Sequence, residues 1–467
     1  MRGIEFIKEL YKTPLNENEE YSIAGRVASV RRHGKITFLD IIDHTGKIQV
    51  VVDRKSLREN IFDEIKNISV GSYVSINGFY RINHRNQPEI AADSIEVLAK
   101  ATLPLSPSPW KIDATDPKHG HQVFGLPSFY LANPKRAAVL KIKTDFIQGL
   151  HQYFQKHNFT LVEPPILTEK TLYSDDNAVQ AKVHGENVFL TQCATFELEP
   201  LAMVYKKVYT ISPAFRNEKG GSKRHLAEYT HAKAEAIKVT LDDLMLLAGE
   251  SIYEGVKYMV DTNESELRLF EVDIDLESLH PNNHVRMTYD EALEIVSKKG
   301  SNTEWGSGLT RCDEIILSDY VGNKYLWVMF PPFESEGFPY KRHPKNRKLS
   351  VVADLIAPHG SGEMVGVAEK ITDPEELIQN LIEKGKKKEI KRYWEYILLR
   401  LYGMPPHGGL GAAPERIIYG LLGLDHIRLT KPYPRYPDRK IATWWYDDLN
   451  PWNDNELERI IDKYDLR

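Results

Sequence analysis

A group of cationic, acidic and aromatic residues lies within one short stretch of the sequence, between Phe215 and Thr230. The stretch reads as a hairpin, in which one strand ends near Phe215 and a second begins near Glu228 after a glycine-bearing loop. Guanidinium groups match phosphate oxygens in geometry, and an aromatic face can stack on a purine. A surface hairpin with solvated charges is the alternative, but the convergence of so many such groups favours a binding site. The candidate residues are Arg216, Glu218, Arg224, His225 and Tyr229.

Two further segments carry residue types that suit a nucleotide. Residues 406–416 read as a glycine-rich turn before a helix, with Pro414 and Arg416 in the first helical turn, where an anion is favoured. Asp354 and Glu363 flank a turn rich in proline and glycine, and carboxylate oxygens suit Mg²⁺. Either segment alone reads equally well as a turn with solvated side chains. Together with the hairpin they predict an ATP site, and the absence of a GxxxxGK[ST] sequence excludes a P-loop.

The elements that position these segments fall into two parts. The chain has 467 residues, of which 42% are hydrophobic, and this length predicts more than one domain. Residues 1–12 read as a short helix. Residues 21–98 contain about five short alternating segments, with a helical stretch near 55–66, which is typical of a small OB-type β-barrel. Another kind of small β-barrel would give the same pattern.

Beyond residue 135 the pattern mixes strands with helices, without one-for-one alternation. This mixture predicts an α+β domain on an antiparallel sheet flanked by helices. The predicted helices are 135–157, 241–260, 289–297, 374–402 and 414–422, and the predicted strands are 205–212, 325–329 and 351–356. The predicted domains are a barrel at 1–100, a proline-rich hinge at 101–135, a catalytic domain at 136–437 and an extension of unknown role at 438–467.

The composition restricts the cellular compartment and the kinds of partner that we expect for this protein. The net charge of −5 argues against non-specific coating of nucleic acid. Cys193 and Cys312 are the only cysteines, which excludes a disulfide framework and a CxxC metal site. The charged N-terminus is unlike a signal peptide, and no apolar run is long enough for a membrane span. We therefore expect a cytoplasmic protein with no membrane partner.

The three chemical segments resemble class II aminoacyl-tRNA synthetases of the aspartate, asparagine and lysine subgroup. Arg-x-Glu followed by Arg-His-Leu-Ala-Glu-Tyr is similar to the second motif of that class, residues 409–416 are similar to its third, and residues 160–167 to its first. The resemblance runs from the barrel to about Pro437. It implies an anticodon-binding OB barrel, a class II catalytic domain and a homodimer. It also implies ATP and Mg²⁺, and transfer of an activated amino acid to tRNA.

The resemblance assigns a role to each residue of the hairpin. Arg216 would hold the α-phosphate, and Glu218 would hold the adenine amino group. Arg224 and His225 would reach the β- and γ-phosphates, while Tyr229 would stack on one face of adenine.

The other two segments would complete the site. Arg416 would cover the second face of adenine near the γ-phosphate, and Asp354 and Glu363 would hold Mg²⁺. The implied reaction is in-line attack of an amino-acid carboxylate on the α-phosphate. It needs positioning and charge stabilisation, with Arg216, Glu218 and Arg416 as the catalytic set, and no side-chain nucleophile.

The sequence around Leu198-Glu199 favours asparagine as the amino acid. Residues 189–199 are similar to the asparaginyl strand that ends in Leu-Glu, whereas the aspartyl enzymes carry a lysine where Leu198 stands. Glu199 could accept a hydrogen bond from a side-chain amide and would repel a β-carboxylate.

Departures from the family pattern cluster around the amino acid. Thr195 stands for a glutamine, Lys370 for an arginine and Glu336 for a lysine, and the usual Glu-Gly-Ala loop is replaced by residues 173–178. Asp175 or Asp176 could hold the α-amino group in place of that loop. The expected amino-acid-binding set is Asp176, Thr195, Glu199 and Lys370. We expect asparagine to be activated weakly, or a relative of it to be preferred.

The barrel carries residue types that could read an anticodon. Arg31 precedes Phe38, a candidate stacking platform, and Gln49 and Glu89 follow on later strands. The alternative for Phe38 is packing in the barrel core. Two other functions stay open at this point: a paralogue that passes its activated amino acid to a small molecule, and a silent RNA- or partner-binding protein.

Overall fold

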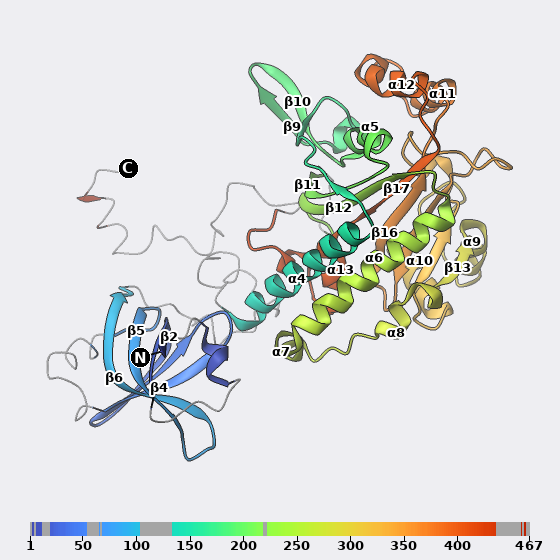
Figure 1. Ribbon diagram of the computed structural model, residues 1–467. Coiled ribbons are helices and arrows are strands. Elements are labelled where there is room, and N and C mark those ends of the chain that lie inside the picture. Colours follow the sequence, from blue (N-terminus) through green and yellow to red (C-terminus); the bar gives the residue numbers. More distant parts are fainter. Residues whose placement is uncertain are drawn as a thin grey trace. The chain divides into compact units, whose positions relative to one another are not determined.

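Figure 1 shows the computed structural model of the chain. The structure describes residues 2–3, 6–11, 19–53, 65, 68–102, 133–217, 222–435, 459 and 462–463. Two compact units divide the chain: Met1–Ala138 with Ala442–Arg467, and Val139–Ile441. Most of the predicted hinge and of the C-terminal extension, and nearly all of the predicted helical stretch at 55–66, lie outside the described residues.

The first unit contains a closed β-barrel, as the alternating segments predict. Its sheet has the order β1-β2-β3-β4-β6-β5, and an additional pairing of β2 with β5 closes it. Alternate residues of each strand face a core that includes Ile23, Leu39 and Val50, all almost fully buried. The OB-type expectation is confirmed. The main strands are β2 (Glu20–His33), β3 (Ile36–Ile42), β4 (Lys47–Asp53), β5 (Tyr73–Ile82) and β6 (Pro88–Ala99).

The predicted helix over residues 1–12 is wrong. Arg2–Gly3 forms β1, which pairs in parallel with β2, and only Ile7–Tyr11 forms a short 3₁₀ helix, η1. Ile7 and Leu10 are buried against the barrel. Their spacing of three residues fits a single 3₁₀ turn as well as a longer α-helix, so the pattern alone could not separate the two.

The second unit is built on an eight-stranded sheet of order β13-β14-β15-β16-β17-β12-β11-β7. The central pairs are antiparallel, and the outermost pairs, β13 with β14 and β7 with β11, are parallel. This confirms the predicted α+β fold. The strands are β7 (Thr160–Leu161), β11 (Lys207–Phe215), β12 (Glu228–Ile237), β13 (Val285–Thr288), β14 (Leu326–Met329), β15 (Val352–Ala357), β16 (Gly362–Glu369) and β17 (His407–Ala412). A separate small sheet contains β8 (Leu167–Thr168), β9 (Gln180–Val183) and β10 (Glu186–Leu190).

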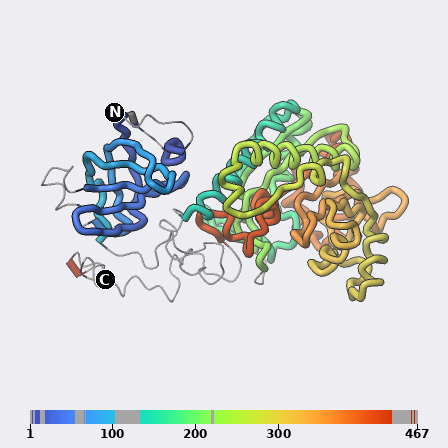
Figure 2. Tube along the Cα trace, turned by 90° about the horizontal axis from the view of Figure 1, so that it is seen from below, coloured from blue at the N-terminus to red at the C-terminus, as the bar shows by residue number. Residues whose placement is uncertain are grey.

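Two long helices, α4 (Pro134–Lys156) and α6 (Leu241–Thr262), run side by side (Figure 1). They approach closely at Gly149, where a Cβ atom would lie 2.8 Å from the Cα of Gly255. Within the second unit, α4 also contacts α13 (Pro414–Leu421), drawn in red in Figure 2, through Lys143 Nζ, which donates to Glu415 Oε1 at 3.3 Å. Further helices are α5 (Thr195–Tyr205), α7 (Glu264–Leu267), α8 (Leu276–Leu279), α9 (Tyr289–Lys298), α10 (Arg311–Tyr320), α11 (Pro374–Glu383) and α12 (Trp394–Leu401).

Three sequence predictions in this unit are wrong in detail. The predicted strand through Leu198-Glu199 ends at Leu190, and these residues lie on α5, which is rich in good helix formers. The predicted helix 374–402 is interrupted between α11 and α12, where Gly385 has a φ of 75°. The predicted glycine-rich turn is β17, a strand whose glycines make room for its neighbours: a Cβ at Gly408 would lie 2.5 Å from the carbonyl oxygen of Ala368.

Candidate active site

The hairpin predicted around Arg216 is formed by β11 and β12, which pair from Phe215 with Glu228 onwards. The Arg216 guanidinium lies 5.3 Å from the ring centre of Tyr173 and 5.9 Å from that of Tyr229. The Tyr229 hydroxyl donates to the carbonyl of Gln192 at 3.2 Å, and burial raises the pKa of this phenol, so it remains protonated. A cation and an aromatic face therefore lie together at the end of the hairpin.

The loop of the hairpin carries the next cation, Arg224. Its Nη1 donates to Glu314 Oε2 of α10 at 2.8 Å and to the carbonyl of Ser361 at 3.5 Å. His225 follows it and is half-buried. Glu218 lies outside the described residues, so its predicted contact with adenine stays a prediction.

Asp354 and Glu363 come together on the β15–β16 hairpin, on either side of Gly366. A Cβ on this glycine would lie 2.8 Å from Asp354 Oδ1 and 3.8 Å from Glu363 Oε1. Burial raises the pKa of Asp354 well above its usual range, and Glu363, Glu336 and Glu314 raise it further. Such a carboxylate group gains strongly from a bound cation.

Arg416 lies at the same place, although it is distant in sequence. Its Nη1 donates to both the carbonyl and the carboxylate of Glu363, each at 3.3 Å. The structure thus brings the predicted cations Arg216, Arg224 and Arg416 to the same sheet as the predicted Mg²⁺ ligands.

Glu336 is a further acid of this region. Burial raises its pKa to about 7, with a contribution from the nearby charge of Glu363. Glu336 and Asp176 line one cleft of about 410 Å³. Of the two candidate aspartates, Asp175 is held by Arg392 at 2.7 Å and by Thr171 at 2.6 Å. Asp176 is exposed, and no side-chain partner for it occurs among the described residues.

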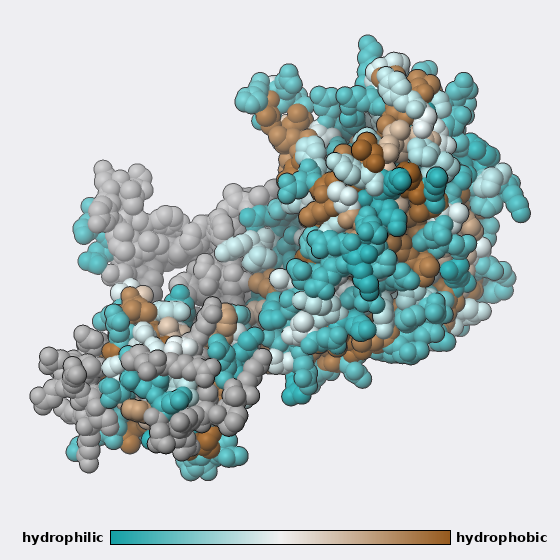
Figure 3. Space-filling view, viewed as in Figure 1, coloured by the Kyte–Doolittle hydropathy of each residue, from teal (hydrophilic) through white to brown (hydrophobic). Residues whose placement is uncertain are grey.

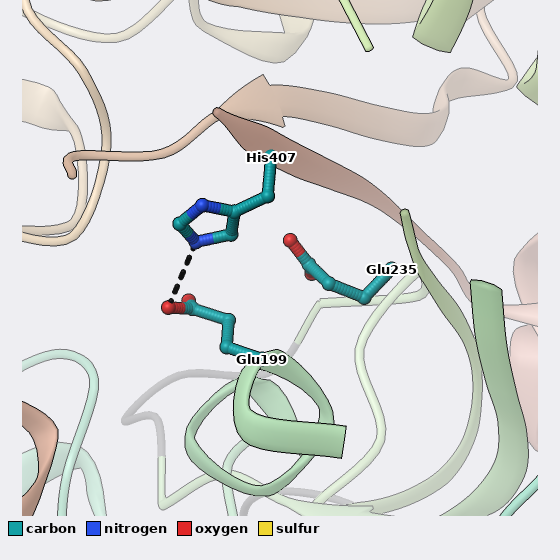
Figure 4. Close-up of side chains that lie close together, drawn as sticks. All are labelled: Glu199, Glu235 and His407. Carbon is teal, nitrogen blue, oxygen red and sulfur yellow. Dashed lines mark hydrogen bonds and ion pairs between the residues drawn. The ribbon is translucent and has the colours of Figure 1, made fainter. Parts of the chain in front are cut away.

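The residues expected to bind the amino acid include Glu199 and Lys370, which belong to a buried ion cluster. Lys370 Nζ lies 3.1 Å from Glu199 Oε1 and 3.0 Å from Glu235 Oε2. The other oxygen of Glu199 accepts from Arg400 and, at 3.1 Å, from His407 (Figure 4). Burial alone would raise the pKa of Glu199, but Lys370, Arg400 and His407 outweigh burial and hold it well below the usual range.

This cluster changes the roles expected for two residues. Both oxygens of Glu199 are engaged by the protein, Oε1 also accepting from Tyr396 at 2.6 Å. Lys370 is equally engaged, so neither group is open to a substrate without a rearrangement. The ligand atoms of Glu199, Glu235 and His407 also lie within 4.8 Å of one another, as in a metal site, but the ammonium of Lys370 supplies the cation there. Thr195 is fully buried at the start of α5, where its hydroxyl accepts from the Cys193 thiol at 3.3 Å.

Sequence reasoning missed Glu235, Arg400 and His407. A signal for Glu235 was present, because Tyr229, His231, Lys233 and Glu235 alternate along one predicted strand and so share one face. Arg400 and His407 gave no such signal, since they reach Glu199 from α12 and β17, about 200 residues away in sequence.

The four predicted anticodon residues lie together on the barrel. Arg31 Nη2 donates to Gln49 Oε1 at 3.0 Å, and Gln49 Nε2 donates to Glu89 Oε2 at 2.8 Å. The Arg31 guanidinium lies 6.0 Å from the ring centre of Phe38, its partner in the β2–β3 register. Phe38 is only half-buried, whereas Leu39 beside it is fully buried. The ring is therefore partly open to a ligand and not a core residue.

Comparison with known families identifies this arrangement. The family described as tRNA synthetases class II (D, K and N) matches residues 127–437. The chain belongs to this family. A second family, the OB-fold nucleic acid binding domain, matches residues 21–98. This class II tRNA synthetase is a ligase that activates an amino acid and transfers it to tRNA.

The similarity to known proteins extends over almost the whole length of this synthetase. The asparagine–tRNA ligase of Pyrococcus furiosus is 30% identical over 91% of this chain and 97% of its own length. The asparagine–tRNA ligase of Desulforamulus reducens is 32% identical over 90% of this chain and 95% of its own length. The crystal structure of the asparaginyl-tRNA synthetase of Pyrococcus horikoshii with asparaginyl-adenylate is 29% identical, with a TM-score of 0.86 over 93% of this chain and 98% of that one.

Proposed function

We propose that this synthetase forms an aminoacyl adenylate from ATP and asparagine, or an amino acid of similar size, and transfers the aminoacyl group to a tRNA. The observation that carries the proposal is a set of contacts between segments distant in sequence. Arg216 lies beside Tyr229 on the β11–β12 hairpin, and Arg416 of α13 donates to Glu363, which lies close to Asp354 on the β15–β16 hairpin of the same sheet. Relatives named asparagine–tRNA ligases support asparagine as the first substrate to test.

In this mechanism Arg216 holds the α-phosphate and stabilises the charge that develops on it during attack by the amino-acid carboxylate. Tyr229 stacks on adenine, and Arg416 covers the opposite face near the γ-phosphate. Arg224 and His225 hold the terminal phosphates, and Glu218 holds the adenine amino group. No side chain needs to act as a nucleophile, because the substrate carboxylate attacks directly.

The carboxylates at Asp354 and Glu363 fit Mg²⁺. They offer only oxygen ligands, and the raised pKa of Asp354 reflects repulsion that a cation relieves. Bound Mg²⁺ would neutralise phosphate charge. Glu336 and Glu314, two further acids near this pair, would strengthen the local negative field.

The barrel, residues 1–100, would bind the tRNA anticodon through Phe38, with Arg31, Gln49 and Glu89 reading base edges. The domain at 136–437 would carry the chemistry, with residues 101–135 as the hinge. Transfer to tRNA is favoured over release to a small molecule because the nucleic-acid-binding domain is retained. No helix among the described residues has the length and apolar character of a membrane span, and we propose the cytoplasm as the compartment.

A homodimer would use the surface around the first motif. Large apolar side chains are exposed on neighbouring elements of the second unit, and hydrophobic residues gather near β9 and β10 in Figure 3. An exposed group of this kind is typical of an interface. The exposed side chains are Leu161, Ile166, Leu167, Val204 and Tyr205.

The proposed function is tested by ATP–pyrophosphate exchange across a panel of amino acids. We expect exchange that depends on asparagine or an amino acid of its size. Exchange with none of the panel, by a folded protein, would contradict the proposal and favour a silent binding protein.

A further inference from the structure

Lys233 is a buried lysine that forms no direct ion pair within the described part of the chain, although the charges of Glu235 and Glu199 act on it. Its side chain points from the middle of β12, and the residue is only 6% exposed. Among the described residues, no hydrogen bond or ion pair to its ammonium group occurs. Buried ammonium groups are normally paired, so a lysine that lacks a partner here is available to a ligand.

The nearby carboxylates are already neutralised. Glu235, two residues along the same strand face, is held by Lys370, and Glu199 is held by Lys370 and Arg400. Lys233 is therefore a cation in excess of this cluster. Glu197 of α5 is a further acid nearby, but burial raises its pKa to about 7 and no ion pair joins it to Lys233 among the described residues.

Lys233 lies between the two ends of the substrate site. Lys233 shares one face of β12 with Tyr229, His231 and Glu235. Tyr229, on one side of it, lies near Arg216, and Glu235, on the other side, belongs to the buried ion cluster. The residues of β17 that pair with Lys233 and Glu235 are both glycines. Gly411 pairs with Lys233, and Gly409 pairs with Glu235. His231 is held neutral, since burial lowers its pKa well below the usual range, with contributions from Lys233 and Arg216.

An amino acid whose carboxylate approaches Arg216 would thus direct its side chain along β12 to Lys233. We propose that Lys233 binds the side-chain end of the amino-acid substrate, and that the pocket therefore prefers a carboxylate to a carboxamide of the same length. This inference rests on the proposed function and names the substrate class of its site: a short acidic amino acid, such as aspartate.

The physical reason for the preference is charge. A carboxylate supplies the counter-ion that the buried ammonium lacks, whereas a carboxamide supplies only a neutral acceptor. The expectation that Glu199 would repel a carboxylate loses its basis, because both of its oxygens face cations or hydrogen-bond donors. Burial and the like charge of Lys370 lower the pKa of Lys233 by more than the charges of Glu235 and Glu199 raise it, and an anionic ligand would oppose this lowering.

The test is pyrophosphate exchange with aspartate and asparagine, using the full chain. Lys233→Met keeps most of the length of the side chain without its charge, and Lys233→Gln offers a neutral donor. We expect the unmodified protein to show a higher kcat/KM for aspartate than for asparagine. Lys233→Met should lose about a hundredfold in kcat/KM for aspartate with an unchanged KM for ATP, and Lys233→Gln should shift the preference toward asparagine.

Lys207→Met is the matched control, because this exposed lysine lies on β11 outside the proposed site. Its contacts among the described residues are the carbonyl of His157, at 3.4 Å, and the ring of Phe159. Lys207→Met should leave kcat/KM for aspartate and KM for ATP unchanged. A preference of the unmodified protein for asparagine, or unchanged constants in Lys233→Met, would overturn the inference.

Exchange with no amino acid at all would instead count against the proposed function. Calorimetric titration of aspartate and asparagine in the presence of ATP would then decide the role of Lys233. Aspartate binding that is lost in Lys233→Met supports the inference, and equal binding of aspartate to both proteins contradicts it.

Discussion

The guanidinium of Arg416 donates to the carboxylate of Glu363 at 3.3 Å. Arg416 lies at the start of α13 and Glu363 at the start of β16, and both side chains remain partly exposed. Arg416, which we propose for the γ-phosphate, is thus paired with Glu363, which we propose for Mg²⁺. Binding of Mg·ATP would exchange this pair for one Arg–phosphate and one carboxylate–metal contact, so that charges are balanced before and after binding.

Replacement of Arg216 by alanine should abolish adenylate formation. The change removes the guanidinium fork from the reacting phosphate, and loss of a comparable charge-stabilising donor costs about 3–4 kcal/mol of barrier. Pyrophosphate exchange measures the effect. Arg268→Ala, at an exposed arginine paired with Glu264, serves as the control. Normal exchange in a folded Arg216→Ala protein would show that another group carries this role.

Mg²⁺ should bind at Asp354 and Glu363 only when ATP is present. Mg²⁺ keeps a near-octahedral shell, which substrate phosphates help to complete. Isothermal titration of Mg²⁺ should therefore show tight binding with ATP and little without it, and Asp354→Asn should weaken the ATP-dependent step. Tight binding of Mg²⁺ to the protein without ATP would argue against this role.

Removal of the Phe38 ring should weaken tRNA binding by about 1–3 kcal/mol, the range for one base stacked on an aromatic side chain. ATP binding should not change, because Phe38 belongs to the barrel. Filter binding or fluorescence anisotropy with tRNA measures the difference. Phe79→Ala is a suitable control, since Phe79 is a 43% exposed aromatic residue on β5. Equal losses in both variants would mean that Phe38 has no specific role.

Glu199→Gln should destabilise the catalytic unit by about 3–5 kcal/mol, because it leaves buried cations without their counter-ion. The folded pKa of Glu199 lies well below its ordinary value of 4.5. Its stabilising contribution is therefore fully present above about pH 4.5 and is lost as the pH falls toward the folded value. Urea denaturation at pH 7 and at pH 4 should show a smaller loss of stability on acidification in the variant than in the parent. An unchanged urea midpoint in Glu199→Gln would contradict this view of the cluster.

The grouping of the residues that we propose for the nucleotide could be predicted from the sequence because these residues are close together in the chain. Arg216, Arg224 and Tyr229 belong to one hairpin, and Asp354 and Glu363 belong to another, so short-range turn chemistry already indicated their grouping. The closeness of Arg31 and Phe38 in the barrel could be predicted for a similar reason, since these residues are partners in one strand pair.

The amino-acid half could not be predicted in the same way. Glu199 meets Lys370, Arg400 and His407 only through long-range packing of α5, β16, α12 and β17. The glycines of β17 read as a turn because their role, to admit neighbouring groups, is visible only once the strands are paired. The alternation along β12 placed Lys233 on the same face as Tyr229, but its proposed role could not be predicted, since this role depends on the lack of an ion pair among the described residues.

Charging of tRNA tests the central claim most directly. Total tRNA would be incubated with ATP, Mg²⁺ and labelled aspartate or asparagine, and acid-stable label on tRNA would be counted for the parent and Arg216→Ala. We predict ATP-dependent attachment of the amino acid to tRNA by the parent and none by the variant. Absence of label on tRNA, despite active pyrophosphate exchange, would contradict the claim that this chain transfers its activated amino acid to tRNA.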